Sequence, residues 1–376
     1  MAVEQVRWSW SSGWVPHPPG RLEPPPQLVL VFGDEVALQN AALDDVRRAW
    51  PGAAVLGCST AGEICDTHVA DGTLAVTAVA FAHTAVKGGR VRVDADSADT
   101  GARLAALLPR EGLRHAFVLA DGLGVDGTRL ARGLRHGLPP HVAVTGGLAG
   151  DGNRFQQTRV VWDGAADPGT AAIVGFYGER LRVGHGCMGG WGAFGPERLV
   201  TRASGRVLYE LDGQPALALY KKYLGEHASG LPATGLLFPL MLRTRDGAQG
   251  LGRSVLGIDE AEQSVLFAGD MPEGAYARFM VANRDRLLDG AVEAARSARE
   301  GLGGAEADLA LLVSCAGRKL VLDQGVEDEV ESVREVMGGR PALAGFYAYG
   351  ELAPLGADAR IELQNQTMSV TTFAEG

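Results

Sequence analysis

Three stretches of the chain repeat one pattern of apolar, small and acidic positions. Each starts with a short apolar run, passes through a turn of small or aromatic residues, and ends on a glycine followed by a carboxylate. The turns cover 57–63, 145–151 and 345–351, and their acidic residues are Glu63, Asp151 and Glu351. A fixed pattern that recurs at separate places indicates one supersecondary unit used repeatedly.

An apolar, strand-like run also precedes each copy, at 28–32, 117–120 and 309–313. A helical pattern leads from each of these runs to the apolar run before the turn. Because two neighbouring parallel strands need such a crossover, we predict strand–helix–strand units over 27–65, 115–152 and 308–352. Ligands of open α/β sheets bind outside the carboxyl ends of the strands, so we expect the three turns to converge on one cleft.

From 180 to 282 the pattern changes to short β-like runs between turn signals, interrupted by one helical run at 215–224. The predicted fold class is therefore α/β of mixed (α+β) character. Repeated strand–helix–strand units form layered α/β halves, with a β-rich antiparallel region in between. We expect a proline-rich arm over 1–26 and a domain boundary near Gln214, which divides the remainder into 27–214 and 215–376.

The charge composition of the chain indicates which classes of binding partner are unfavourable. Lys and Arg number 35 and Asp and Glu 45, a net charge of −10, and no basic run stands out. This balance argues against nucleic acid and anionic membranes as partners. The chain shows neither a signal-peptide pattern nor an apolar run near the ~20 residues of a membrane helix. Cysteines without C-x-x-C spacing argue against a disulfide framework or a structural zinc site, so we expect a cytoplasmic protein.

Five motifs together resemble the FIST family, and the resemblance spans about residues 27 to 370. The motifs are 57–63, 146–152, 195–198 (Gly-Pro-Glu-Arg), 344–351 and 365–368 (Asn-Gln-Thr-Met). The resemblance implies a sensory, small-ligand-binding module of bacterial signal transduction. Amino acids are the ligands suggested for that family, and some members are similar to haem-dependent nitric oxide sensors. This chain has Gln364 where the resemblance leads us to expect a histidine, which counts against haem ligation at that position.

The chemistry of the turns favours an amino acid over a nucleotide. A phosphate-binding loop needs lysine after its last glycine, whereas these turns carry a carboxylate that repels phosphate. Carboxylates can hold an amine, while turn amides and neighbouring hydroxyls or Arg253 hold a carboxylate. The alternative that each acid only caps the amides of the following segment stays open. The predicted ligand-binding residues are Cys58, Ser59, Thr60, Glu63, Gly146, Gly147, Asp151, Arg253, Cys315, Tyr347, Tyr349 and Glu351.

Two alternatives concern catalysis and haem. Cys58 follows a strand and could serve a cysteine-dependent hydrolase or transferase, but no histidine neighbours it in sequence and buried inert cysteine is common. We therefore expect no enzyme, no catalytic residue and no metal. Haem b would need an axial ligand, for which His185 beside Cys187 is the candidate. No cofactor is expected.

The output of a sensor of this kind has to lie elsewhere. The sequence contains no recognisable kinase, cyclase or DNA-binding segment beyond the resemblance. We therefore expect the ligand signal to pass to a separate signalling protein, such as a histidine kinase or a cyclase or phosphodiesterase.

Overall fold

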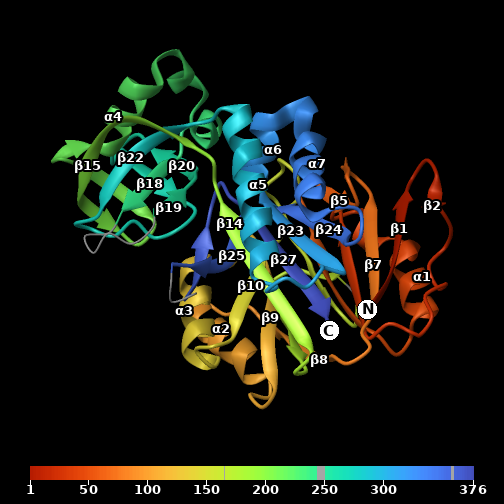
Figure 1. Cartoon of the computed structure of the whole chain (residues 1–376). Helices are drawn as coiled ribbons and strands as arrows, with labels where there is room; N and C mark the ends of the chain where they lie inside the picture. The colour runs from red at the N-terminus through yellow and green to blue at the C-terminus, as the bar shows by residue number, and fades with distance from the viewer. Residues whose placement is uncertain (165, 244–249, 357–359) are drawn as a thin grey trace.

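The protein consists of three mixed sheets that enclose one core and a fourth, β-rich sheet set to one side (Figure 1). The computed structural model describes residues 1–164, 166–243, 250–356 and 360–376. The mixed α/β class and the three strand–helix–strand units predicted from the sequence are confirmed. No helix of the described residues is long and apolar enough to span a membrane.

The three enclosing sheets share one plan. Each has a parallel strand pair at its centre, and two antiparallel strands continue the sheet on one side. We call them sheets A, B and C. In spatial order, sheet A contains β12 (Ala166–Asp167), β11 (Val160–Trp162), β4 (Ala54–Ser59), β3 (Leu28–Gly33), β7 (Leu74–Ala80), β1 (Ala2–Ser9) and β2 (Gly13–Val15). Sheet B contains β14 (Leu181–Met188), β27 (Met368–Glu375), β23 (Leu309–Cys315), β24 (Ala342–Ala348), β5 (Glu63–Cys65) and β6 (His68–Ala70). Sheet C contains β26 (Arg360–Gln364), β25 (Gly350–Leu355), β10 (Ala143–Leu148), β9 (Leu113–Ala120), β13 (Thr170–Tyr177) and β8 (Ala85–Arg92).

The helices of the three units pack on the outer faces of their own sheets. Side chains before several of them accept a hydrogen bond from the first turn, as Asn40, Asp126 and Asn283 do, and so fix where the helix begins. The helices are α1 (Ala41–Ala49) on sheet A; α2 (Ser97–Ala106) and α3 (Gly127–Gly137) on sheet C; α5 (Arg284–Glu300), α6 (Ala316–Leu322) and α7 (Val326–Met337) on sheet B; and the 3₁₀ turns η1 (Ala37–Gln39) and η4 (Asp323–Gly325).

The segment after each glycine–carboxylate turn leaves its own sheet and completes a neighbouring one. β5 follows the first unit in sequence but pairs with β24 of the third, and β25 follows the third unit but pairs with β10 of the second. β11 follows the second unit and pairs with β4 of the first. The exchange therefore runs in a closed cycle, and the three sheets are related by an approximate threefold arrangement.

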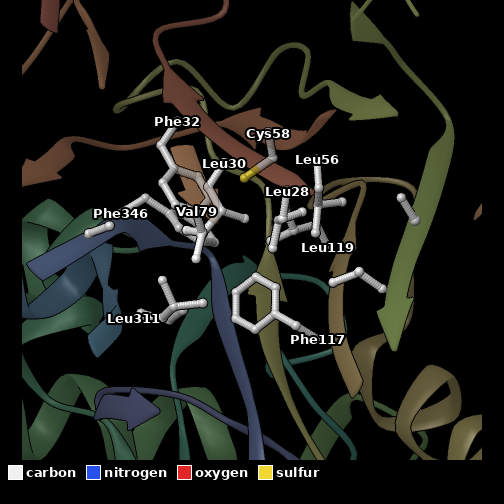
Figure 2. Packing of buried hydrophobic residues seen from close by; sticks show 14 of the residues in the cluster. Leu28, Leu30, Phe32, Leu56, Cys58, Val79, Phe117, Leu119, Leu311 and Phe346 are labelled. Atoms are coloured by element: carbon white, nitrogen blue, oxygen red, sulfur yellow. The ribbon is translucent and has the colours of Figure 1, made fainter. Parts of the chain in front are cut away.

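The inner faces of the three sheets meet in one apolar core. Figure 2 shows side chains of β3, β4, β9, β23 and β24 packed against one another around Cys58. The rings of Phe32 and Phe346, from sheets A and B, stack with centroids 4.7 Å apart. Burial of this shared apolar surface holds the three units together and brings their turns to one end of the core.

The fourth sheet lies between the second and third units along the chain, as the change of pattern predicts. It is antiparallel and packs against α4. Its elements are β15 (Gly192–Ser204), β16 (Val207–Leu211), β17 (Gln214–Pro215), α4 (Ala216–Leu224), η2 (Gly225–Gly230), η3 (Ala233–Leu237), β18 (Leu240–Arg243), β19 (Leu251–Arg253), β20 (Val255–Asp259), β21 (Ser264–Phe267) and β22 (Tyr276–Val281). The boundary near Gln214 falls between the paired strands β16 and β17, and the division into domains stays a prediction.

Residues before the first unit include a strand. β1 pairs with β7 over Ala2–Trp8, and Trp14 of β2 donates its ring N–H to Asp45 at 3.0 Å. Trp14 is thus held against the body of the protein, whereas Trp10 is exposed. The proline-rich stretch 16–27 forms no helix or strand.

Candidate functional site

The three glycine–carboxylate turns meet and are hydrogen-bonded to one another through their backbones. Each pair of turns is joined by at least one bond between main-chain atoms. These bonds run from Gly150 N to Ser59 O (2.9 Å), from Ala61 N to Tyr347 O (2.8 Å), from Tyr347 N to Gly62 O (2.8 Å) and from Tyr349 N to Leu148 O (3.1 Å). The expected convergence of the turns is confirmed, and a ligand cleft between them stays a prediction.

Glu63 links two sheets through its side chain. It lies on β5 of sheet B, and its Oε2 accepts hydrogen bonds from the backbone N (3.2 Å) and hydroxyl (2.7 Å) of Thr73, at the start of β7 in sheet A. Its Oε1 accepts a bond from the Thr60 hydroxyl at 2.5 Å. Burial raises the pKa of Glu63 to about 7, against the lowering effect of these bonds.

Glu351 makes the corresponding link between sheets C and B. Its Oε2 accepts hydrogen bonds from the backbone N (3.1 Å) and hydroxyl (2.7 Å) of Thr367, and the Cys315 thiol also lies within hydrogen-bonding range. Burial raises the pKa of Glu351 to about 8. Its other oxygen, Oε1, is buried and has no hydrogen-bond partner. Glu351 is thus a fully buried carboxyl with one oxygen that accepts no hydrogen bond, which we call its open oxygen.

Asp151 behaves differently from the two glutamates. It accepts hydrogen bonds from the backbone N of Phe155, Gln156 and Gln157 at 2.8–2.9 Å, and the Tyr349 hydroxyl donates to it. Burial alone would raise the pKa of Asp151, but these bonds outweigh it and hold the pKa below its usual value. Asp151 therefore caps the segment that follows it, as the alternative for the acids supposes.

The remaining first- and second-unit candidates mostly serve packing. Cys58 is fully buried in the apolar core, and burial raises the pKa of its thiol well above the usual value. Ser59 Oγ accepts a bond from Arg159 N at 2.8 Å. A Cβ on Gly146 would stand 1.9 Å from the carbonyl oxygen of Val118, and one on Gly147 would stand 2.7 Å from Val313. The two glycines allow close strand packing.

Two other predicted ligand-binding residues, Arg253 and Tyr347, are hydrogen-bonded to structural partners. Arg253 is buried and donates to the backbone oxygens of Asp270, Gly252 and Leu363 at 2.9–3.2 Å. It fastens the β-rich sheet to β26 and is not the surface arginine that its type suggests. Tyr347 donates its hydroxyl to Glu329 at 2.9 Å.

Sequence reasoning missed several residues at the turns. Lys319 of α6 donates to the carbonyl oxygen of Ala61 at 2.9 Å and forms an ion pair with Asp71. Thr73 and Thr367 supply the donors that fix the two glutamates. Thr367 belongs to the Asn-Gln-Thr-Met motif, and this motif could have identified Thr367 as a residue of the site. Thr73 and Lys319 carry no local signal that sets them apart from other surface residues.

His185, the candidate axial ligand for haem, lies half-buried on β14. It lies on β14 opposite Thr371, and its Nε2 is buried without a partner. The opposite face of β14 is covered by α5, because a Cβ on Gly184 would stand 1.8 Å from the carbonyl oxygen of Ala298. Among the described residues no group of three or more His, Cys, Asp or Glu side chains could hold a metal ion.

Comparison with known proteins gives both a family match and more distant likenesses. The FIST N domain model matches residues 27–214 and the FIST C domain model matches residues 216–354. An uncharacterized protein of Mycobacterium bovis is 30% identical over 250 residues, which are 63% of this chain and 61% of that protein. An uncharacterized protein of Mycobacterium tuberculosis is 29% identical over 235 residues, 57% of each chain. The chain thus spans about three fifths of the length of these curated relatives.

One solved structure is similar at a low level. It is a crystal structure of cyanuric acid hydrolase from A. caulinodans, with 7% sequence identity, a TM-score of 0.37 and a match that covers 99% of each chain.

Proposed function

Because the chain belongs to the FIST family, whose domains are associated with sensory signal transduction and small-ligand binding, we propose that it is a sensory protein for an amino acid or a similar small metabolite. The ligand binds where the glycine–carboxylate turns meet. The proposal includes a separate signalling protein as the partner that receives the signal, such as a histidine kinase or a cyclase or phosphodiesterase.

The observation that carries this proposal is the hydrogen-bonded meeting of the three turns. Backbone bonds such as Ala61 N to Tyr347 O join segments almost 290 residues apart, and they bring buried carboxyls of all three units to one end of the core. This end is the carboxyl end of the parallel strand pairs, where α/β proteins bind ligands. Glu63 and Asp151 are satisfied by neighbouring donors, whereas Glu351 retains an open oxygen.

Cysteine-dependent catalysis receives no support from the geometry. The nucleophile of such an enzyme is a thiolate, which needs an adjacent base or a depressed pKa. Cys58 lies instead among apolar side chains such as Leu30 and Leu56, and its pKa is raised (Figure 2).

Ligand binding should stabilise the protein by mass action. We expect at least one compound in a panel of amino acids, purines and organic acids to raise the melting temperature in a dose-dependent way, by about 2.7 kcal/mol of stability at 100 times its Kd. A thermal-shift screen measures this directly. Unchanged melting curves across the whole panel would contradict the sensory proposal.

The haem alternative predicts a Soret band in the absorption spectrum of the purified protein. Because Gln364 stands where the family resemblance leads us to expect a histidine, we expect protein purified from haem-supplied cells to show no stoichiometric Soret band. A strong band that shifts with nitric oxide would overturn this expectation. Its loss in His185→Ala would then identify the axial ligand.

A further inference from the structure

Glu63 and Glu351 occupy equivalent places in the first and third units. Each follows the turn glycine, begins the strand that crosses to a neighbouring sheet, and accepts two hydrogen bonds from one threonine, Thr73 or Thr367. The donor distances agree within 0.1 Å, at 3.2 and 3.1 Å for the amides and 2.7 Å for both hydroxyls. Differences between the two sites therefore show what each unit adds to a common frame.

The first difference removes a hydrogen-bond donor from the third unit. Thr60, three residues before Glu63, donates to the Oε1 of that glutamate at 2.5 Å. The residue three before Glu351 is Ala348, which has no hydroxyl. This substitution leaves the Oε1 of Glu351 buried and unpartnered. A buried acceptor without a partner costs about 1–3 kcal/mol, so the opening needs a reason.

The second difference adds two amide side chains in the segment that pairs with and follows the strand of Glu351. Glu63 pairs across the strands with Ala70, whereas Glu351 pairs with Gln364. Two residues later, the first unit has Gly72 at φ +73° and the third has Gln366 at φ +66°. A glutamine held in this left-handed conformation is strained relative to glycine, and such strain concentrates at functional sites.

The hydrogen bonds of Gln366 fix which of its atoms stays open. Its Nε2 donates to the carbonyl oxygen of Leu236 at 3.1 Å and to Ser254 Oγ at 2.9 Å, so its Oε1 is the atom left without a partner. Gln364 has the complementary state, because its buried Nε2 is the unpartnered atom. Asn365, between the two glutamines, also has a buried Oδ1 and Nδ2 without partners, so among the described residues the third unit presents unpartnered acceptors and donors together, whereas both oxygens of Glu63 in the first unit have partners.

We propose that Glu351, Gln364 and Gln366 form the recognition site for a primary ammonium group that carries an oxygen acceptor close by. Glu351 Oε1 and Gln366 Oε1 accept hydrogen bonds from the ammonium, and Gln364 Nε2 donates to the neighbouring oxygen. This inference rests on the proposed sensory function and names the side chains near the convergent turns that contact the ligand.

The charges that face Glu351 suit a cationic head group. The groups facing it are the thiols of Cys315 and Cys187, from β23 and β14, and the guanidinium of Arg318 from α6. Arg318 is tied to Glu329 by a buried ion pair at 2.5 Å, so it does not neutralise Glu351 directly. Because burial raises the pKa of Glu351 to about 8, an arriving ammonium would take the place of the proton on this carboxyl and become its counter-ion. Charge-assisted bonds of this kind are stronger than neutral ones.

The test compares each amino acid that raises the melting temperature with its N-acetyl derivative, which lacks the ammonium. We expect the acetylated form to bind at least about 100-fold more weakly, and Glu351→Gln to weaken the free amino acid to a similar extent. Glu331→Gln is the control and should leave the affinity within about twofold of wild type, since Glu331 is an exposed carboxylate of α7. Calorimetric titration supplies the Kd values.

A second variant tests the missing hydroxyl without removing any site residue. Ala348→Ser places a donor where Thr60 stands in the first unit, so it should occupy Glu351 Oε1. We expect a higher melting temperature in the absence of ligand and an affinity lowered about tenfold. Binding that is undisturbed in both Glu351→Gln and Ala348→Ser, or equally tight binding of the acetylated compound, overturns this site while leaving the sensory proposal intact. No shift with any compound overturns both.

Discussion

Replacing Glu329 with alanine should lower the free energy of unfolding by about 3–5 kcal/mol. Glu329 and Arg318 form a fully buried ion pair between α7 and α6. The same carboxylate accepts hydrogen bonds from the hydroxyls of Ser314 (3.0 Å) and Tyr347 (2.9 Å). Alanine at this position leaves the buried guanidinium without a counter-charge and two hydroxyls without an acceptor. Urea unfolding of the two proteins measures the difference.

The control for this prediction lies on the same helix. Glu331 of α7 is exposed, so Glu331→Ala should change stability by no more than about 0.5 kcal/mol. Replacing both members of the pair, as in Arg318→Met with Glu329→Leu, should recover much of the loss because apolar pairs can substitute for buried ion pairs. A Glu329→Ala protein as stable as the Glu331→Ala protein would show that the ion pair does not hold α6 and α7 in place.

Helices and turns could be predicted from the sequence where adjacent residues determine them. The apolar stripe of 284–300 predicts a helix with the bounds that α5 has, because Asn283 caps its start and the periodicity ends at Gly301. The three units were found for the same reason: an apolar run, an amphipathic helix and a turn are each written in adjacent residues. The sequence pattern places crossover helices at 126–138 and 327–337, and these ranges agree with α3 and α7 to within about two residues, the usual uncertainty of helix ends.

The exchange of strands between sheets could not be predicted in this way. β5 is three residues long, and its pairing partner Phe346 lies far away along the chain. Nothing in Glu63–Cys65 distinguishes a strand that returns to its own sheet from one that completes another. The choice depends on how the three inner faces pack, which is set by side chains of all three units together.

The candidate site was predicted in outline and missed in detail. The three acids were found because each follows a turn glycine, and their convergence is confirmed. The distinction between them depends on the partners Thr60, Thr73 and Thr367, which are ordinary residues when they are read singly. Arg253 shows the same limit: its type suggests a surface position, whereas three backbone carbonyls hold it inside the protein.

The stability of the protein should fall as pH rises from about 6.5 to about 8, because of Glu351. Its pKa is raised from the model-compound value of 4.5 to about 8, so the folded state binds this proton more tightly than the unfolded state does. Where the folded state holds more protons, the free energy of unfolding decreases with pH, and the decrease ends above the folded pKa. Glu63, with a pKa of about 7, adds a decrease that ends earlier.

Below about pH 6.5 a buried histidine works in the opposite direction. Burial lowers the pKa of His115 to about 3, so the unfolded state binds more protons there and stability rises with pH. The interval from about 6.5 to about 8 therefore isolates the carboxyls. Glu351→Gln mimics the protonated acid and should flatten the profile in this interval by up to about 2 kcal/mol. Urea unfolding at several pH values decides the matter, and parallel profiles for wild type and Glu351→Gln would show that Glu351 is ionised in the folded protein at neutral pH.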